Sequence, residues 1–107
     1  MAEPLLIVMT TLPDREQART LARQVVEARL AACAQVGAPM ESFYRWQGAV
    51  EEAHETPLLF KTVPARYAAL EAFLQQNHPY ALPEIMAVND VHGSSAYLDW
   101  VAQETQS

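Results

Sequence analysis

One histidine in this chain sits where the backbone holds a polar side chain with little freedom. His78 lies in the stretch 77–84, Asn-His-Pro-Tyr-Ala-Leu-Pro-Glu, in which Pro79 and Pro83 each force the preceding residue into an extended conformation. Neutral imidazole binds copper(II), zinc(II) and nickel(II) near neutral pH. His78 is therefore the first candidate metal ligand, and the alternative is a helix-ending histidine that bonds a nearby carbonyl.

The single cysteine is a second and softer candidate ligand. Cys33 follows Ala31 and Ala32, and a lone cysteine in such company is more often a small buried side chain. With one thiol, an internal disulfide and a multi-thiolate zinc site within one chain are excluded. Cys33 and His78 are distant in sequence, so folding or subunit contact must assemble any site that uses both.

A further set of candidate residues is built around a lysine. Lys61 follows the apolar residues 58–60 on a predicted strand, where its charge needs a partner, and Glu84 at the start of a later strand is the candidate. Two interpretations stay open. Lys61 and Glu84 could form an ion pair at an interface between subunits, packed among aromatic side chains, or they could line a cleft between subunits that accepts a small anion or metabolite. The aromatic side chains that would line it are Trp46, Tyr80 and Tyr97.

Two charged segments have simpler explanations. The segment 51–55, Glu-Glu-Ala-His-Glu, is predicted to project into solvent, where it can hold a metal loosely or bind one adventitiously. Arg15, Arg19 and Arg23 line the polar side of the first predicted helix, where they could attract an anion, but the pattern favours an ordinary solvated helix face.

Size and composition bound what the chain can be. Its 107 residues are enough for one domain, 1–107, with a single core. The net charge of −6 argues against nucleic acid as a partner, because phosphate binding needs clustered lysine and arginine. A signal peptide and a membrane span are not expected, since the first residues lack a basic region and the apolar run 5–9 is short. We therefore expect a cytoplasmic protein.

Hydrophobic patterns and turn residues predict an alternating order of elements. Strands are expected over 4–11, 33–46 with a break at Gly37 and Pro39, 50–62 and 84–89. Helices are expected after Asp14, which forms a capping pair with Gln17, after Pro64, and near the C-terminus. This order predicts an α+β, ferredoxin-like β-α-β-β-α-β fold with a C-terminal helix and both main helices on one sheet face.

The second sheet face leads to an expectation about assembly. The first and last predicted strands are apolar on both faces, and one short terminal helix is too small to cover the side opposite the main helices. Monomers rarely expose apolar patches beyond about 300–600 Å². We therefore expect a homo-oligomer that packs through the sheet.

Several motifs, in order along nearly the whole chain, resemble those of the CutA divalent-cation tolerance family. They are Leu30-Ala31-Ala32-Cys33, Ser42-x-Tyr44-x-Trp46-x-Gly48, Glu51-Glu52, Lys61-Thr62, His78-Pro79-Tyr80-x-x-Pro83-Glu84 and Tyr97-Leu98-x-Trp100. The resemblance implies a ferredoxin-like subunit in a homotrimer similar to the PII signalling proteins, a cytoplasmic location, divalent metal binding (notably copper) and a role in cation tolerance. It implies no reaction.

The chain departs from the family at positions linked to copper. Met9 stands where some members have cysteine, and Asn77 stands where some have a second histidine. A thioether is a weaker ligand that prefers copper(I). The metal candidates are therefore His78 and Cys33.

Three classes of function follow. The leading hypothesis is a non-enzymatic trimer that binds divalent cations, with copper(II) as the expected metal. The alternative is a PII-like sensor that binds a small molecule between subunits, which rests on analogy of fold. An acyl-phosphate hydrolase on this fold is disfavoured, because the loop 11–14 carries no glycine and ends in aspartate where an anion site is required.

Overall fold

The sheet is built on two long central strands in this computed structural model, which describes residues 4–106. Strand β1 (Leu5–Leu12) pairs antiparallel with the second half of β4 (Ala49–Thr62). Strand β2 (Cys33–Val36) adds to the free side of β4 and β5 (Met86–Val91) to that of β1, which gives the order β2-β4-β1-β5. The predicted ferredoxin-like α+β fold is confirmed.

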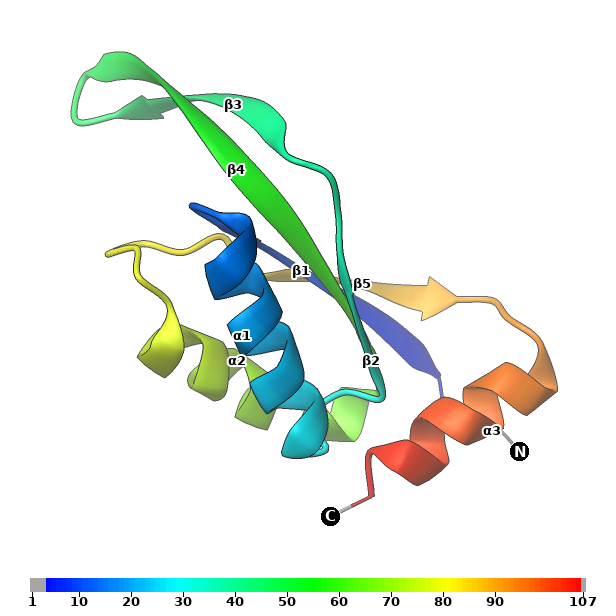
Figure 1. The fold of residues 1–107 in the computed structure, drawn as a ribbon. Coiled ribbons are helices and arrows are strands. Elements are labelled where there is room, and N and C mark those ends of the chain that lie inside the picture. Colours follow the sequence, from blue (N-terminus) through cyan, green and yellow to red (C-terminus); the bar gives the residue numbers. More distant parts are fainter. Residues whose placement is uncertain (1–3, 107) are drawn as a thin grey trace.

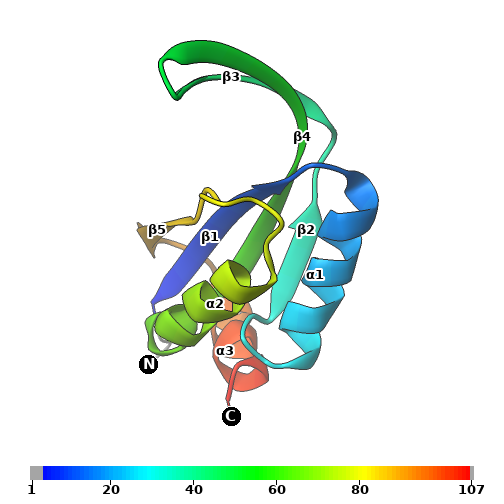
Figure 2. The same cartoon turned by 90° about the vertical axis from the view of Figure 1, so that its left-hand side faces the viewer.

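Both main helices lie on one face of the sheet, as Figures 1 and 2 show. They are α1 (Arg15–Glu27) and α2 (Pro64–Asn77). The predicted cap of α1 is present: Asp14 accepts a hydrogen bond of 2.8 Å from the backbone N–H of Gln17 and another of 2.8 Å from its side-chain amide. The cap fixes where α1 begins, directly after β1.

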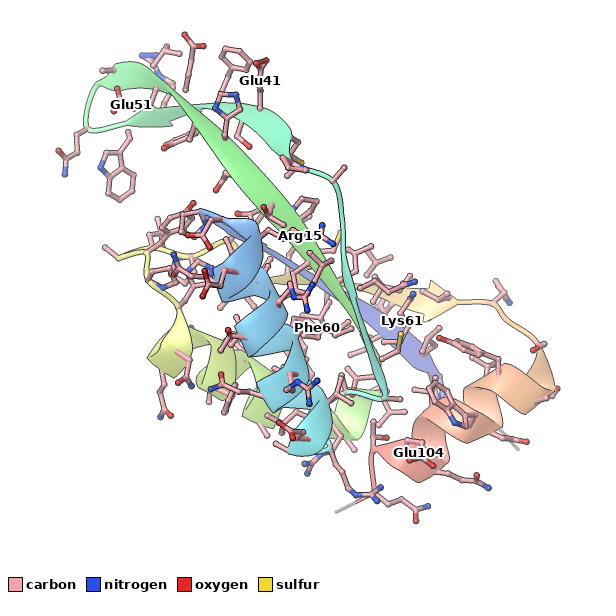
Figure 3. The ribbon with its side chains drawn as sticks, in the orientation of Figure 1. Arg15, Glu41, Glu51, Phe60, Lys61 and Glu104 are labelled. Atoms are coloured by element: carbon pink, nitrogen blue, oxygen red, sulfur yellow. The ribbon has the colours of Figure 1, made fainter. Side chains whose placement is uncertain are left out.

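The core lies between this helical layer and the sheet because β4 alternates along its length. Leu58, Phe60 and Thr62 are fully buried beneath the helices, whereas Leu59 and Lys61 are half-buried on the opposite side. Figure 3 shows Phe60 and Lys61 on the two sides of the strand. An alternation of period two thus assigns each residue of β4 to one face.

The opposite face is only partly covered. Helix α3 (Ser95–Glu104) packs Val101 against Leu5 and Val63 at one end. The remainder is open: Met86 and Val88 on β5 are each 48% exposed. These exposed apolar side chains lie on the face that was expected from the sequence to be left uncovered in a single chain. The strand predicted over 84–89 lies over Met86–Val91 and so begins two residues later.

A long hairpin, which we call the arm, consists of β3 (Met40–Trp46) and the first part of β4, residues 49–55. The predicted break is present, since residues 37–39 separate β2 from β3 and the N–H of Gly37 donates to the Pro57 carbonyl at 2.9 Å. Gln47 and Gly48 have φ of 50° and 84°, as in the tight turn predicted there. Figure 2 shows the arm curling beyond the sheet.

The helices are short, and α2 is the longest at 14 residues. Over residues 4–106 none of them is long and apolar enough to cross a bilayer.

Candidate functional site

The His78 side chain is fixed by the backbone on both sides of its ring. Helix α2 ends at Asn77, and His78 adopts an extended conformation (φ −89°, ψ 139°), as Pro79 requires. Its Nε2 lies 2.7 Å from the Thr11 carbonyl oxygen, and its Nδ1 accepts from the Tyr80 N–H at 3.2 Å. A carbonyl only accepts, so Nε2 carries the proton and Nδ1 carries the lone pair.

The surroundings keep this imidazole neutral. Partial burial lowers the pKa of His78 below its ordinary value, although the Thr11 carbonyl and the charge of Glu55 oppose the shift. Histidines that bind metals usually donate their other N–H to a carbonyl or carboxylate. His78 has that arrangement toward the Thr11 carbonyl, so Nδ1 is the atom that a metal would bind. The metal would then replace the weak hydrogen bond that Nδ1 accepts from the Tyr80 N–H.

Glu55 lies at the base of the arm and accepts hydrogen bonds from hydroxyl groups on other elements. Its Oε2 accepts from Thr11 Oγ1 on β1 and from the Tyr80 hydroxyl, each at 3.0 Å. Tyr80 belongs to residues 78–84, the segment directly after α2, which we call the corner. Desolvation acts to raise the pKa of Glu55, but hydrogen bonds from Ser42, Tyr80 and Thr11 outweigh it and lower the pKa. Glu55 therefore stays ionised at neutral pH and joins the arm, β1 and the corner after α2.

The sequence prediction that placed all of 51–55 in solvent is wrong for Glu55, which is half-buried. The same alternation separates the predicted ligands of the arm, because Glu51 and Glu55 lie on one face of β4 while Glu52 and His54 lie on the other. His54 instead pairs with Glu41, with 3.7 Å between Nε2 and Oε2. The sequence did contain one signal, because Glu55 is separated by only Thr56 from the apolar run 57–60, where the strand returns to the core.

A second cluster occupies the open sheet face near α3. Cys33 and Lys61 are cross-strand partners on β2 and β4. Lys61 donates through Nζ to Oε1 of Gln35, so its polar partner is this amide and not the predicted Glu84. Burial, and then the nearby Cys33, raise the pKa of Tyr97, whose ring centroid lies 5.7 Å from that of Trp100.

Within one chain, the structure distributes the predicted cleft residues over three places. Lys61 and Tyr97 belong to the open-face cluster, Tyr80 and the exposed Glu84 to the corner, and Trp46 to the far end of β3. No ion pair links Lys61 to Glu84 among residues 4–106. A cleft that uses all five requires residues from more than one copy.

The two candidate metal ligands are also apart. Thr11, which holds His78, pairs with Pro57, whereas Cys33 pairs with Lys61, four residues further along β4. Four residues of strand span about 13 Å. Within the described part of the chain, no group of at least three histidine, cysteine, aspartate or glutamate residues is placed to hold a metal. A metal bound through His78 would need ligands from water or another subunit.

Comparison with known proteins connects this geometry to one family. A family model described as CutA1 divalent ion tolerance protein matches residues 6–104. The divalent-cation tolerance protein CutA of Thermus thermophilus is 42% identical over 99 residues, which are 92% of this chain and 96% of that protein. A chloroplastic CutA protein of Arabidopsis thaliana is 35% identical over 104 residues, 97% of this chain and 57% of the plant protein.

Solved structures agree with the sequence matches. A divalent cation tolerance protein from Thermus thermophilus superposes with a TM-score of 0.92 at 41% identity, covering 95% of this chain and 99% of that one. CutA1 from Oryza sativa superposes with a TM-score of 0.94 at 32% identity, covering 98% and 96% of the respective chains. The likeness therefore extends over nearly the whole chain.

Proposed function

This chain belongs to the CutA1 divalent ion tolerance family. We propose that it is a non-enzymatic homotrimer that binds divalent cations, chiefly copper(II), and that this binding serves cation tolerance. The observation that carries the proposal is the His78 ring, whose Nε2–H is held by the Thr11 carbonyl so that Nδ1 keeps its lone pair. Imidazole is a strong ligand for copper(II) near neutral pH. A cytoplasmic location is part of the same proposal, and cell fractionation tests it.

Assembly supplies what one chain lacks. The open sheet face exposes Met86 and Val88, and Ile7, Met9 and Leu59 lie half-buried beside them. Packing this face against other copies would remove the apolar area from water. It would also bring the Cys33 cluster of one copy toward the other copies, so that a thiolate and an imidazole from different subunits can share a metal.

Metal titration tests the proposal. Metal-free protein is titrated with copper(II), zinc(II) and nickel(II) by calorimetry, and light scattering gives the mass of the assembly. We expect tight copper uptake near one per subunit, loss of that uptake in His78→Ala, and weaker uptake in Cys33→Ser. His54→Ala is the matched control, because His54 is an exposed histidine on the arm, and it should bind as the unaltered protein does. Full copper affinity in His78→Ala would refute the assigned site.

A second candidate function is a PII-like sensor that binds a small molecule between subunits. The observation that favours it is Lys61, a half-buried cation that is paired with the neutral Gln35 and lies across the strands from Cys33, which in turn lies near Tyr97. No ion pair joins Lys61 to a carboxylate among residues 4–106, and such a positive charge at a subunit boundary suits a small anionic ligand. Thermal-shift screening with nucleotides and small organic acids tests this, and Lys61→Gln should abolish any stabilisation seen. No stabilisation by any of them would exclude this class.

A further inference from the structure

Tyr80 attaches the corner to the rest of the chain through two hydrogen bonds. Its backbone N–H donates to Nδ1 of His78 at 3.2 Å, and its hydroxyl donates to Oε2 of Glu55 at 3.0 Å. Its ring also packs against the imidazole, with 4.9 Å between the two ring centroids. We call these two hydrogen bonds the latch, because they connect the corner to His78 on one side and to the base of the arm on the other.

Little else holds the corner in place. Pro79 and Pro83 have no N–H to donate, Leu82 is 71% exposed, and residues 79–84 belong to no helix or strand. Within the described chain, the hydrogen bonds found for residues 79–84 are the two of the latch. A segment with few buried contacts opens at a low cost in free energy. The latch therefore decides how often the corner is closed.

The first bond of the latch closes the atom that a metal would use. Nε2 of His78 is committed to the Thr11 carbonyl at 2.7 Å, so the remaining lone pair is on Nδ1, where the Tyr80 N–H occupies it. A metal lies about 2.0–2.1 Å from the imidazole nitrogen that binds it, which is shorter than the 3.2 Å between Nδ1 and the Tyr80 nitrogen. Metal and N–H cannot share the lone pair, so the corner must open before a ligand reaches Nδ1.

The second bond of the latch links this opening to the arm. Oε2 of Glu55 accepts from Thr11 Oγ1 as well as from the Tyr80 hydroxyl, and Glu55 is the cross-strand partner of Met40, where β3 begins. When the corner moves away, the half-buried carboxylate of Glu55 loses one of these two donors. The base of the arm is then attached less firmly to β1 and to the corner.

We propose that the latch regulates the His78 site. While Tyr80 is bonded to Glu55, the imidazole is closed to an incoming metal, and metal binding keeps the corner open and loosens the base of the arm. This inference rests on the proposed function, because it concerns the same imidazole. A site that is open for only part of the time binds with an apparent affinity reduced to that fraction. The coupling is reciprocal, so a firmly attached arm opposes metal binding as much as metal binding loosens the arm.

Tyr80→Phe distinguishes a latch from a residue that merely supports the site. The variant keeps the backbone N–H and removes the bond to Glu55, and loss of mere support would weaken metal binding. We instead expect copper(II) to bind Tyr80→Phe about fivefold more tightly in calorimetry, because one hydrogen bond no longer favours the closed corner. Tyr67→Phe is the matched control: Tyr67 lies on α2, its hydroxyl also faces a carboxylate, that of Glu71, and its loss should leave the affinity unchanged.

Access to Nδ1 is also measured without any metal. Diethyl pyrocarbonate acylates the lone pair of a neutral imidazole, and mass spectrometry of the digested protein gives the reaction rate at each histidine. His78 should react about fivefold faster in Tyr80→Phe than in the unaltered protein. His54, an exposed histidine on the arm, should react at the same rate in both proteins. Equal rates at His78 in the two proteins would overturn the latch.

Hydrogen exchange detects the link between the latch and the arm. Saturating copper(II) should speed amide exchange in residues 49–55 of the unaltered protein and have no such effect in His78→Ala. Uptake that depends on His78 but is no tighter in Tyr80→Phe, or copper that leaves exchange in residues 49–55 unchanged, would overturn the latch while the proposed function stands. No copper uptake by the unaltered protein would refute the proposed function and with it the regulation of metal access, even where acylation shows that Tyr80 closes Nδ1.

Discussion

At the scale of single residues, Glu55 connects segments that are far apart in sequence. Its carboxylate accepts from Thr11, 44 residues earlier, and from Tyr80, 25 residues later. The same Tyr80 donates its N–H to Nδ1 of His78. His78, the candidate metal ligand, and Glu55, at the base of the arm, therefore share one hydrogen-bonded network through Tyr80. A change at either residue should affect the hydrogen bonds of the other.

Glu55→Gln should destabilise the protein more than Tyr80→Phe. Tyr80→Phe removes one donor and should cost about 1 kcal/mol, whereas Glu55→Gln replaces an ionised acceptor and leaves half-buried hydroxyls poorly paired, at about 1–3 kcal/mol. Urea unfolding at one fixed protein concentration measures both. Glu52→Gln, an exposed change on the other face of β4, is the control and should have little effect. Equal urea midpoints for all three variants would mean that the hydrogen bonds of Glu55 do not stabilise the fold.

The protein should lose stability as the pH falls below neutrality. Burial lowers the pKa of His78 in the folded chain below its ordinary 6.5, so the unfolded chain takes up a proton more readily and stability declines as the pH drops below that value. The lowered pKa of Glu55 adds a second loss as the pH falls through and below its ordinary 4.5.

His78→Gln separates these two contributions. Between pH 7.5 and 5.5 its urea midpoint should change less than that of the unaltered protein, because the titrating imidazole is gone. Below pH 4.5 both proteins should decline in parallel, since Glu55 is retained. An identical pH dependence down to pH 5.5 in the two proteins would contradict the assignment of the first loss to His78.

At the scale of elements, the connection between β2 and β3 sets the direction of the arm. A Cβ at Gly37 would lie 2.8 Å from Cγ of Pro57, and the Gly37 N–H already bonds the Pro57 carbonyl. Gly37→Ala should therefore displace the arm root and destabilise the fold by about 1–3 kcal/mol, as overpacking does.

Ala38→Ser is the neighbouring control, because Ala38 lies in the same connection. Hydrogen exchange of the arm amides is the measurement that locates the effect of both changes. Faster exchange in Gly37→Ala alone would place the disturbance at this contact, and equal exchange in both variants would show that the approach to Pro57 is not restrictive.

Sequence patterns within one segment predicted the helices, strands and turns well, but they predicted the partners of individual side chains poorly. The Asp14 cap, the Gln47-Gly48 turn and the break at residues 37–39 depend on neighbouring residues, and all are present. The partner of Lys61 and the burial of Glu55 depend on how β2, β4 and the corner meet, which a pattern within one segment does not contain. Periodicity assigns a face to Lys61, but the register with β2 decides that Gln35 reaches it.

At the scale of the whole molecule, the open sheet face predicts how copies associate. Val88→Glu places a charge on the β5 side of that face and should dissociate the assembly, because an unpaired charge is costly to bury. Val26→Glu is the matched control: Val26 is also exposed, at 38%, but lies on α1. Light scattering should report subunit mass for Val88→Glu and the assembled mass for Val26→Glu. Intact assembly in Val88→Glu would move the interface elsewhere.

Native mass spectrometry of the full chain, recorded before and after addition of one equivalent of copper(II), tests whether the protein is a trimer that binds copper through His78. It reports the number of subunits and the number of bound ions in the same spectrum. We expect a homotrimer that retains about one copper per subunit and loses it in His78→Ala. A monomer, or a trimer that retains no copper, would refute the proposed function.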